Sequence, residues 1–244
     1  MPTLTIAKRE LRSYWNSPIA YVVICISLLG LSLVFFNLNG GFWEANRASL
    51  TLLFQYLPQA LGLIVIPVIT MRLVAEERQT GTLEMLITLP VTDRQVIIGK
   101  FLGAWGLVMT LVAATSLFPV MMFGVWNLGS LDSGPVLSSY LGVTLYSAAA
   151  VSIGLFISSL TESQIIAFFI TTVTLFFLNL FGSILALDVL PDNIKLAATF
   201  ISFNERLRDF VRGMINLRDV VFFLSVTGLC LAGSIWGLER RKWA

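Results

Sequence analysis

The sequence contains no histidine, which excludes a histidine metal centre and proton transfer through an imidazole. Its only two cysteines, Cys25 and Cys230, each lie in a long apolar stretch, where they are expected to pack as small apolar residues. The net charge of +2 indicates no nucleic-acid role. No G-x-x-x-x-G-K-[ST] motif occurs, so this sequence offers no P-loop for ATP.

Charge is also scarce: only 12% of the 244 residues are Asp, Glu, Lys or Arg, whereas 57% are hydrophobic. The mean hydropathy of +0.85 is far above that of a soluble domain of this length. Six long windows without charge can each cross a hydrocarbon core about 30 Å thick, which needs roughly 20 helical residues. We therefore predict an all-α membrane protein with one transmembrane domain over 1–244 and six spans, at about 18–38, 50–72, 97–124, 136–160, 163–187 and 219–238.

An even number of spans places both termini on one side of the membrane. Basic residues favour the cytosolic side, and cytosolic termini place ten of the sixteen there. The inside set is Lys8, Arg9, Arg12, Arg72, Arg78, Arg94, Lys100, Arg240, Arg241 and Lys242.

Two shorter segments have amphipathic patterns. Before the first span, apolar residues from Leu4 to Trp15 recur at helical spacing, which favours an interfacial helix over ordinary flanking anchors. Between the fifth and sixth spans, Ser202 and Glu205 form an S-x-x-E capping box. The helix that follows is predicted to lie on or dip into the outer interface with one apolar face, formed by Phe203, Leu207, Phe210 and Val211.

Two patterns within the spans bear on packing. Pro58 and Pro67 interrupt the helical hydrogen-bond ladder of the second span, so bends or local unwinding are expected there, with a gating hinge as the alternative. Gly99 and Gly103 form a G-x-x-x-G pattern at the inner end of the third span, typical of close helix packing. That packing can lie within one subunit or across a dimer.

The second and third spans are joined by a charged cytosolic hairpin, Arg72 to Lys100. Good helix formers prolong the second span to Gln79, Gly81 breaks the helix, and Thr82 can cap a second short helix that ends before Pro90. Thr92 and Gln95 form a T-x-x-Q capping box that starts the third span. The short helix exposes Leu83, Met85, Leu86 and Ile87, which favours a partner protein, although these residues can also lie on the membrane surface.

The runs A-E-E-R-Q-T-G-T-L-E-M-L and L-P-V-T-D-R-Q-V-I-I-G-K-F resemble the signature of the ATP-binding-cassette (ABC) type-2 permeases, the membrane subunits of ABC exporters. The later runs F-N-E-R-L-R-D-F-V-R-G-M-I-N-L-R-D-V-V-F-F-L and L-E-R-R-K-W are similar to the gliding-motility and copper-maturation (nitrous-oxide reductase accessory) branch. The resemblance covers essentially the whole chain.

The resemblance implies a non-catalytic permease in the bacterial cytoplasmic (inner) membrane, paired with a second copy or a homologous permease. A separate cytosolic ATPase chain would bind ATP and Mg²⁺, and this chain would bind no cofactor. The hairpin helix would be the coupling helix that docks on the ATPase, driving substrate export or membrane remodelling. Its matching positions are Glu76, Glu77, Arg78, Gly81, Thr82, Leu83, Glu84, Met85 and Leu86.

Other interpretations remain open at this stage. The hairpin charges can simply form a solvated face that helps to set topology. An ion-coupled secondary transporter would need ionisable residues within the membrane, and the predicted spans contain none. An intramembrane enzyme would need paired carboxylates, a metal set or an activated nucleophile there. The complex can also use ATP to regulate another membrane machine rather than to carry a solute. The apolar spans favour a lipidic or amphipathic cargo.

Overall fold

The computed structural model describes residues 2–37, 50–79, 81, 92–122, 132–185 and 200–241. These residues form helices and contain no strand. In chain order the helices are α1 (Pro2–Trp15), α2 (Pro18–Asn37), α4 (Thr51–Ala60), η2 (Leu61–Val65), α5 (Ile66–Thr70), α6 (Ala75–Gln79), α8 (Asp93–Ala114), α9 (Leu117–Val120), α10 (Ser133–Leu160), α11 (Gln164–Leu185), α13 (Phe203–Val211) and α14 (Leu217–Arg241).

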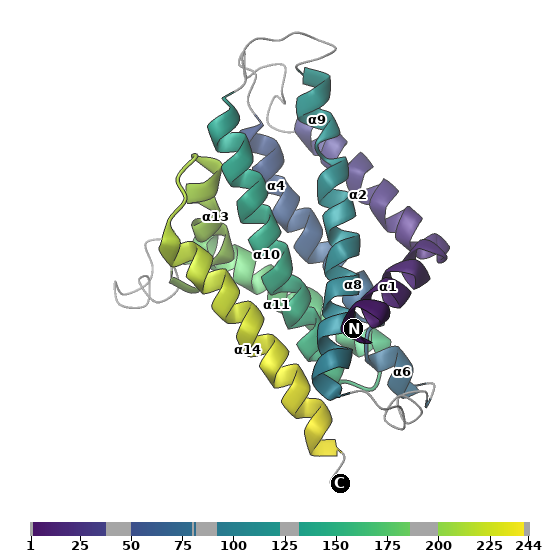
Figure 1. Ribbon diagram of the computed structural model, residues 1–244. Helices are drawn as coiled ribbons and strands as arrows, with labels where there is room; N and C mark the ends of the chain where they lie inside the picture. Colours follow the sequence, from purple (N-terminus) through teal and green to yellow (C-terminus); the bar gives the residue numbers. More distant parts are fainter. Residues whose placement is uncertain are drawn as a thin grey trace.

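The predicted all-α membrane class is confirmed. Among the described residues, five helical segments are long and apolar enough to cross a membrane: Pro18–Phe36, Thr51–Gln79, Asp93–Val120, Ser133–Leu160 and Leu217–Glu239. The remaining predicted span falls on α11, whose apolar part, Gln164–Leu180, is shorter. The first residues of α1, the last residues of α14 and α6 lie toward one end of the bundle, called here the α6 end, and α9 lies at the other (Figure 1).

Helix α10 is the central helix: 72% of its most apolar stretch is buried, against 22% for α2 and 11% for α14. It packs against α14, α13, α8, α11 and α5. Small residues permit this crowding, because neighbouring side chains come close to its backbone. A Cβ at Gly142 would lie 2.8 Å from Phe210, and one at Gly154 would lie 2.3 Å from Thr70 Oγ1.

The second apolar segment is not a regular α-helix. Pro58 lies inside α4, Pro67 lies at the start of α5, and the π-helical turn η2 separates them. Proline removes an amide donor, so the regular ladder cannot run unbroken through either position, and the wider π turn shifts the hydrogen-bond register between them. The sequence predicts an interruption of the helix near the two prolines, and the structure has a π-helical turn between them.

Capping explains where two other helices begin. Thr92 and Gln95 form the predicted capping box of α8, with Gln95 N donating to Thr92 Oγ1 at 3.4 Å and Thr92 N donating to Gln95 Oε1 at 3.2 Å. Glu205 N donates to Ser202 Oγ at 3.4 Å at the start of α13.

Helix α13 buries its apolar face within the protein rather than in the membrane interface. Phe203, Leu207 and Phe210 are buried, Val211 is half-buried, and α13 packs against α10, α11 and α4. Arg206 does not belong to this apolar face, yet it is only 5% exposed. Its guanidinium lies between two aromatic rings, 3.9 Å from the Phe222 centroid and 4.6 Å from that of Phe200. Stacking and an ion pair therefore compensate its burial.

Candidate functional site

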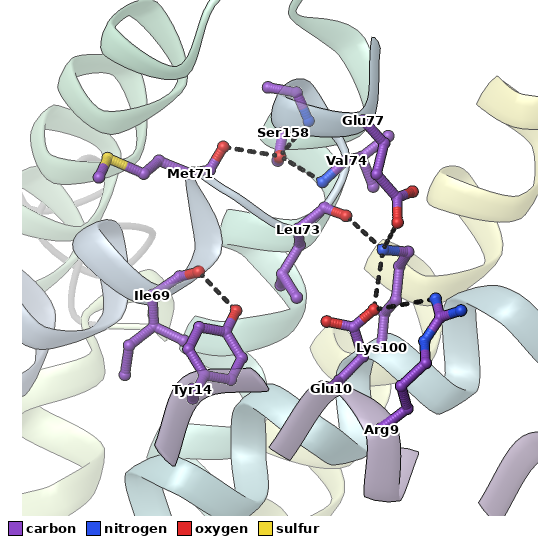
Figure 2. Close-up of polar contacts among 11 residues, drawn as sticks. Arg9, Glu10, Tyr14, Ile69, Met71, Leu73, Val74, Glu77, Lys100 and Ser158 are labelled. Carbon is purple, nitrogen blue, oxygen red and sulfur yellow. Dashed lines mark hydrogen bonds and ion pairs between the residues drawn. The ribbon is translucent and has the colours of Figure 1, made fainter. Parts of the chain in front are cut away.

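The candidate site is an ion cluster around Lys100 at the α6 end of the bundle (Figure 2). The Lys100 ammonium is 2% exposed and donates to Glu77 Oε1 at 2.6 Å, Leu73 O at 2.7 Å and Glu10 Oε1 at 3.2 Å. An ammonium has three hydrogens, and all three are used here. Because Glu77 belongs to α6, Glu10 to α1 and Lys100 to α8, one side chain joins three helices.

The glycines of α8 allow Glu10 to reach Lys100. A Cβ at Gly99 would lie 2.8 Å from Ile6 Cβ, and a Cβ at Gly103 would lie 2.6 Å from Glu10 Cβ. Real Cβ atoms do not approach this closely, so a side chain at either position would push α1 away from α8. The G-x-x-x-G pattern thus lies against the N-terminal helix of the same chain.

Helix α6 is also fastened to the end of α10. Ser158 Oγ accepts hydrogen bonds from Val74 N and Ala75 N, both at 3.2 Å, and so satisfies amides at the start of α6 (Figure 2). Arg78 donates to Ser159 O, and its Nη1 donates to Thr161 O at 3.3 Å. The last carbonyls of a helix have no N–H donor within the helix, and here the Arg78 guanidinium donates to carbonyls at the end of α10.

The predicted partner-binding residues therefore divide into two groups. Glu77 and Arg78 make contacts inside the chain, whereas Glu76 lies 3.8 Å from Arg72 with 45% of its side chain exposed. Gly81 is exposed and has φ +71°, a conformation that glycine adopts readily, and its amide bonds to Arg78 O at 3.1 Å. Thr82, Leu83, Glu84, Met85 and Leu86 lie outside the described residues.

The sequence prediction did not include Glu10, Lys100 or Ser158 among the site residues. Lys100 counted only as a cytosolic flank of the third span, and Ser158 as one of several hydroxyls in the fourth. Only the charge pattern could have indicated this pair. Glu77 lies at the end of the second span and Lys100 at the start of the third, so the two opposite charges lie at the same membrane face. Glu10 is 90 residues from Lys100 in the chain, and no local pattern connects them.

An open hollow of about 440 Å³ lies beside the cluster. Tyr14 lines it and donates its hydroxyl to Ile69 O at 2.9 Å. Burial and then the negative charge of Glu10 raise the pKa of Tyr14, so the phenol stays protonated and remains a donor. The hollow is lined by Arg9, Glu10, Ser13, Tyr14, Ser17, Arg72, Leu73, Glu76, Glu77 and Lys100.

A second polar network lies beside the π-helical turn. Tyr146 of α10 donates its hydroxyl to Pro58 O at 2.9 Å and accepts from Asn179 Nδ2 at 2.9 Å. Asn179 also donates to Leu175 O at 2.9 Å. A Cβ at Gly62 would lie 2.5 Å from the Tyr146 oxygen, so the approach requires glycine. This network holds α4, α10 and α11 together where the second segment departs from α-helical geometry.

A buried ion pair joins α13 to the start of α14. Arg206 Nη1 lies 2.7 Å from Asp219 Oδ1, and both side chains are almost fully buried. Arg206 also donates to Phe200 O through Nε at 2.9 Å and Nη2 at 2.7 Å. The guanidinium is thus well supplied with acceptors, as a buried cation requires.

Comparison with known families identifies the class. Residues 44–204 match the family model described as "ABC-2 family transporter protein". The chain therefore belongs to the ABC-2 transporter family, whose members are multi-pass permease subunits of ABC transporters. The predicted family is confirmed.

Two curated relatives agree with this family. The chain is 33% identical over 105 residues to "Probable multidrug ABC transporter permease YbhR" of Escherichia coli strain K12, and equally to that protein of Escherichia coli O157:H7. Each match covers 43% of this chain but only 27% of the relative. The matched part of the chain thus spans about a quarter of the length of these permeases.

Proposed function

We propose that this chain couples ATP hydrolysis by a separate, cytosolic ATPase subunit to export of a substrate or to remodelling of the membrane. The connection between Gln79 and Thr92 would dock on the ATPase, and ATP and Mg²⁺ would bind to that partner. The observation that carries the proposal is the Lys100 cluster, which ties the base of this connection to α1 and α8.

The contacts of α6 favour transmission of force. Lys100 fastens α6 to α8 and α1, while Ser158 and Arg78 fasten it to α10. A force applied by the ATPase to the connection would therefore be transmitted through α6 to α1, α8 and α10 together. This is the arrangement needed if the energy source lies outside the membrane domain.

The placement of the chain ends supports six crossings. The first residues of α1, the last residues of α14 and α6 lie toward the same end of the bundle (Figure 1), which favours an even number of crossings, whereas five segments of the described residues meet the length and apolarity criteria. Helix α11 supplies the sixth crossing: its 22 residues rise about 33 Å, enough for the hydrocarbon core. The excess of basic residues at the α6 end favours a cytosolic position for that end, and we propose that the chain lies in the cytoplasmic membrane of a bacterium with both termini in the cytosol.

The family and the apolar spans support a proposal for the cargo and the assembly. We propose an amphipathic or lipidic cargo, since the spans are largely apolar and the curated relatives are described as probable multidrug permeases. The transporting unit would be a pair of such permeases, identical or homologous, with an ATPase beneath each.

An ion-coupled secondary transporter is less well supported. Among the described residues the buried charged side chains are Lys100, Arg206 and Asp219, and each has a salt-bridge partner. Lys100 lies near the α6 end, and Asp219 lies in the first turn of α14. A path for ions would need ionisable groups along the middle of the spans.

The proposal is tested by separating docking from folding. Deleting Thr82–Thr88, or reversing the charge of Glu76 and Glu84 together, should abolish co-purification of the ATPase expressed with this chain while membrane insertion continues. Glu77 is left unchanged because it also anchors Lys100. Glu239→Lys is the control, since this exposed acidic residue lies near the end of α14. Undiminished ATPase binding and activity in the hairpin variants would refute the assignment.

A further inference from the structure

Two hollows of opposite character adjoin at the α6 end of the bundle. The first is the open polar hollow beside Lys100. The second is a narrow apolar crevice with about 20 Å³ of free space between α2, the η2–α5 segment and α8. Tyr14, Ser17 and Arg72 line both, so polar and apolar surfaces meet along these three residues.

The apolar crevice lies between three of the segments that are long and apolar enough to cross a membrane. Its walls are formed by aliphatic residues of three helices: Ile19, Ala20, Val23 and Ile24 of α2, Val65, Val68 and Ile69 of the η2–α5 segment, and Leu107 and Leu111 of α8. Helix α2 also has an exposed outer face, which includes Val22 and Ile26. The free space is too small to enclose a chain, so an acyl chain would lie along the mouth of the crevice.

The polar hollow is balanced in charge. Three cationic side chains, those of Arg9, Arg72 and Lys100, line it together with the carboxylates of Glu10, Glu76 and Glu77. Lys100 is fully engaged, but Arg72 Nε is buried and makes no hydrogen bond to any described residue. Glu76 Oε2 lies 3.8 Å from it, beyond hydrogen-bond distance. The Arg72 side chain is nevertheless 30% exposed and lines the hollow, so the rest of its guanidinium can donate to an acceptor ligand there.

We propose that the two hollows together bind one zwitterionic aminophospholipid of the phosphatidylethanolamine type. Its phosphate accepts from Arg72, with Arg9 at the open side, and its ammonium faces the carboxylates. One acyl chain follows the crevice along α2. Equal numbers of both charges suit this headgroup better than a purely anionic one, which the three carboxylates repel. The amphipathic helix α1 places the polar hollow at the depth of lipid headgroups.

This lipid site requires only that the chain lies in a bilayer. A failure of the proposed ATPase coupling would therefore not refute the lipid site, and the reverse also holds. The test uses the purified full chain in detergent with phosphatidylethanolamine that carries a diazirine on one acyl chain. After illumination, peptides are mapped, and the labelling should concentrate on α2 and the η2–α5 segment. Unlabelled phosphatidylethanolamine should compete better than phosphatidylglycerol.

Two pairs of variants locate the headgroup and the chain. Arg72→Gln should weaken labelling about tenfold, as expected for loss of one charge-assisted hydrogen bond, whereas Arg12→Gln, an exposed arginine of α1 outside the hollow, should not. Val23→Trp should block the crevice, whereas Val22→Trp on the adjacent exposed face should leave labelling unchanged. All four variants are compared only as monodisperse, membrane-extracted protein.

Other outcomes would overturn the proposal. Equal labelling in Arg72→Gln and Arg12→Gln would show that the phosphate does not bind at Arg72. Labelling spread evenly over α2, α11 and α14 would show ordinary contact with bulk lipid. Stronger competition by phosphatidylglycerol would show that the headgroup is anionic and would refute the zwitterionic assignment.

Discussion

Replacing Lys100 by Met removes the ammonium that joins α1, α6 and α8 and leaves a side chain of similar length. Glu77 then loses its 2.6 Å contact with the ammonium, Glu10 keeps Arg9 at 3.8 Å but loses Lys100, and Leu73 O loses a donor. Breaking a fully buried pair costs about 3–5 kcal/mol because one charge is left uncompensated. The two carboxylate side chains keep 18% and 15% of their exposure beside an open hollow, so water screens part of that cost. We expect a loss of roughly 2–3 kcal/mol of unfolding free energy.

The loss is measured as a shift in the thermal unfolding midpoint of the purified protein in detergent, at one scan rate. At about 2–4 °C per kcal/mol for a chain of this size, Lys100→Met should lower the midpoint by roughly 4–12 °C. Glu77→Gln should cost less, because Lys100 keeps Glu10 and Leu73 O. The double variant should lose less than the sum, with a coupling of about 1–2 kcal/mol between the pair.

The matched control is Arg208→Gln, which breaks the exposed pair between Arg208 and Glu205 at 3.4 Å. Exposed pairs contribute about 0.2–1 kcal/mol, so this variant should barely move the midpoint. If Lys100→Met moved it no further than Arg208→Gln, the cluster would not hold the three helices together. Additive effects of Lys100→Met and Glu77→Gln would likewise refute the coupling.

Two further variants test the packing on either side of this cluster. Gly103→Val should displace α1 and lower the free energy of unfolding by roughly 1–3 kcal/mol. The effect is measured as a lower unfolding midpoint and faster proteolysis of the N-terminal helix. Gly30→Ala is the control: no atom lies within 4 Å of the new Cβ, so this variant should be neutral or slightly stabilising. Tyr146→Phe should cost about 1–3 kcal/mol because Pro58 O loses the buried Tyr146 donor and Asn179 Nδ2 loses an acceptor. Tyr140→Phe, whose hydroxyl lies 3.4 Å from Thr115 Oγ1, should cost less in the same unfolding assay.

The sequence predicted those features that depend on composition and local pattern. Uncharged windows of sufficient length identified the helical membrane class, and the capping residues Thr92 and Ser202 identified the starts of α8 and α13. The two prolines of the second segment predicted a break, but not its form. The form of the break involves contacts from distant parts of the chain: Pro58 O, which accepts from Leu61 N, also accepts from the Tyr146 hydroxyl, 88 residues away.

Long-range pairing explains most of what the sequence did not predict. Arg206 follows the helical period of a solvated face, yet it is buried because Phe200, Phe222 and Asp219 surround it. Lys100 matches the charge pattern of a cytosolic flank, yet it is buried because α1 and α6 bring carboxylates to it. Amphipathic periodicity assigns a charged residue to water unless its partner is known.

The inward contacts of Glu77 and Arg78 separate two roles that the hairpin was predicted to combine. Both residues hold α6 against the bundle, so substituting them changes how the hairpin is held, whatever it contacts outside. Contact with an ATPase would then fall to the more exposed Glu76 and to residues beyond Gly81, which follows α6 with a positive φ. Variants beyond Gly81 should therefore lose the partner and keep their unfolding midpoint, whereas variants at Glu77, Lys100 or Ser158 should keep the partner and lose the link between ATP hydrolysis and movement of α8 and α10.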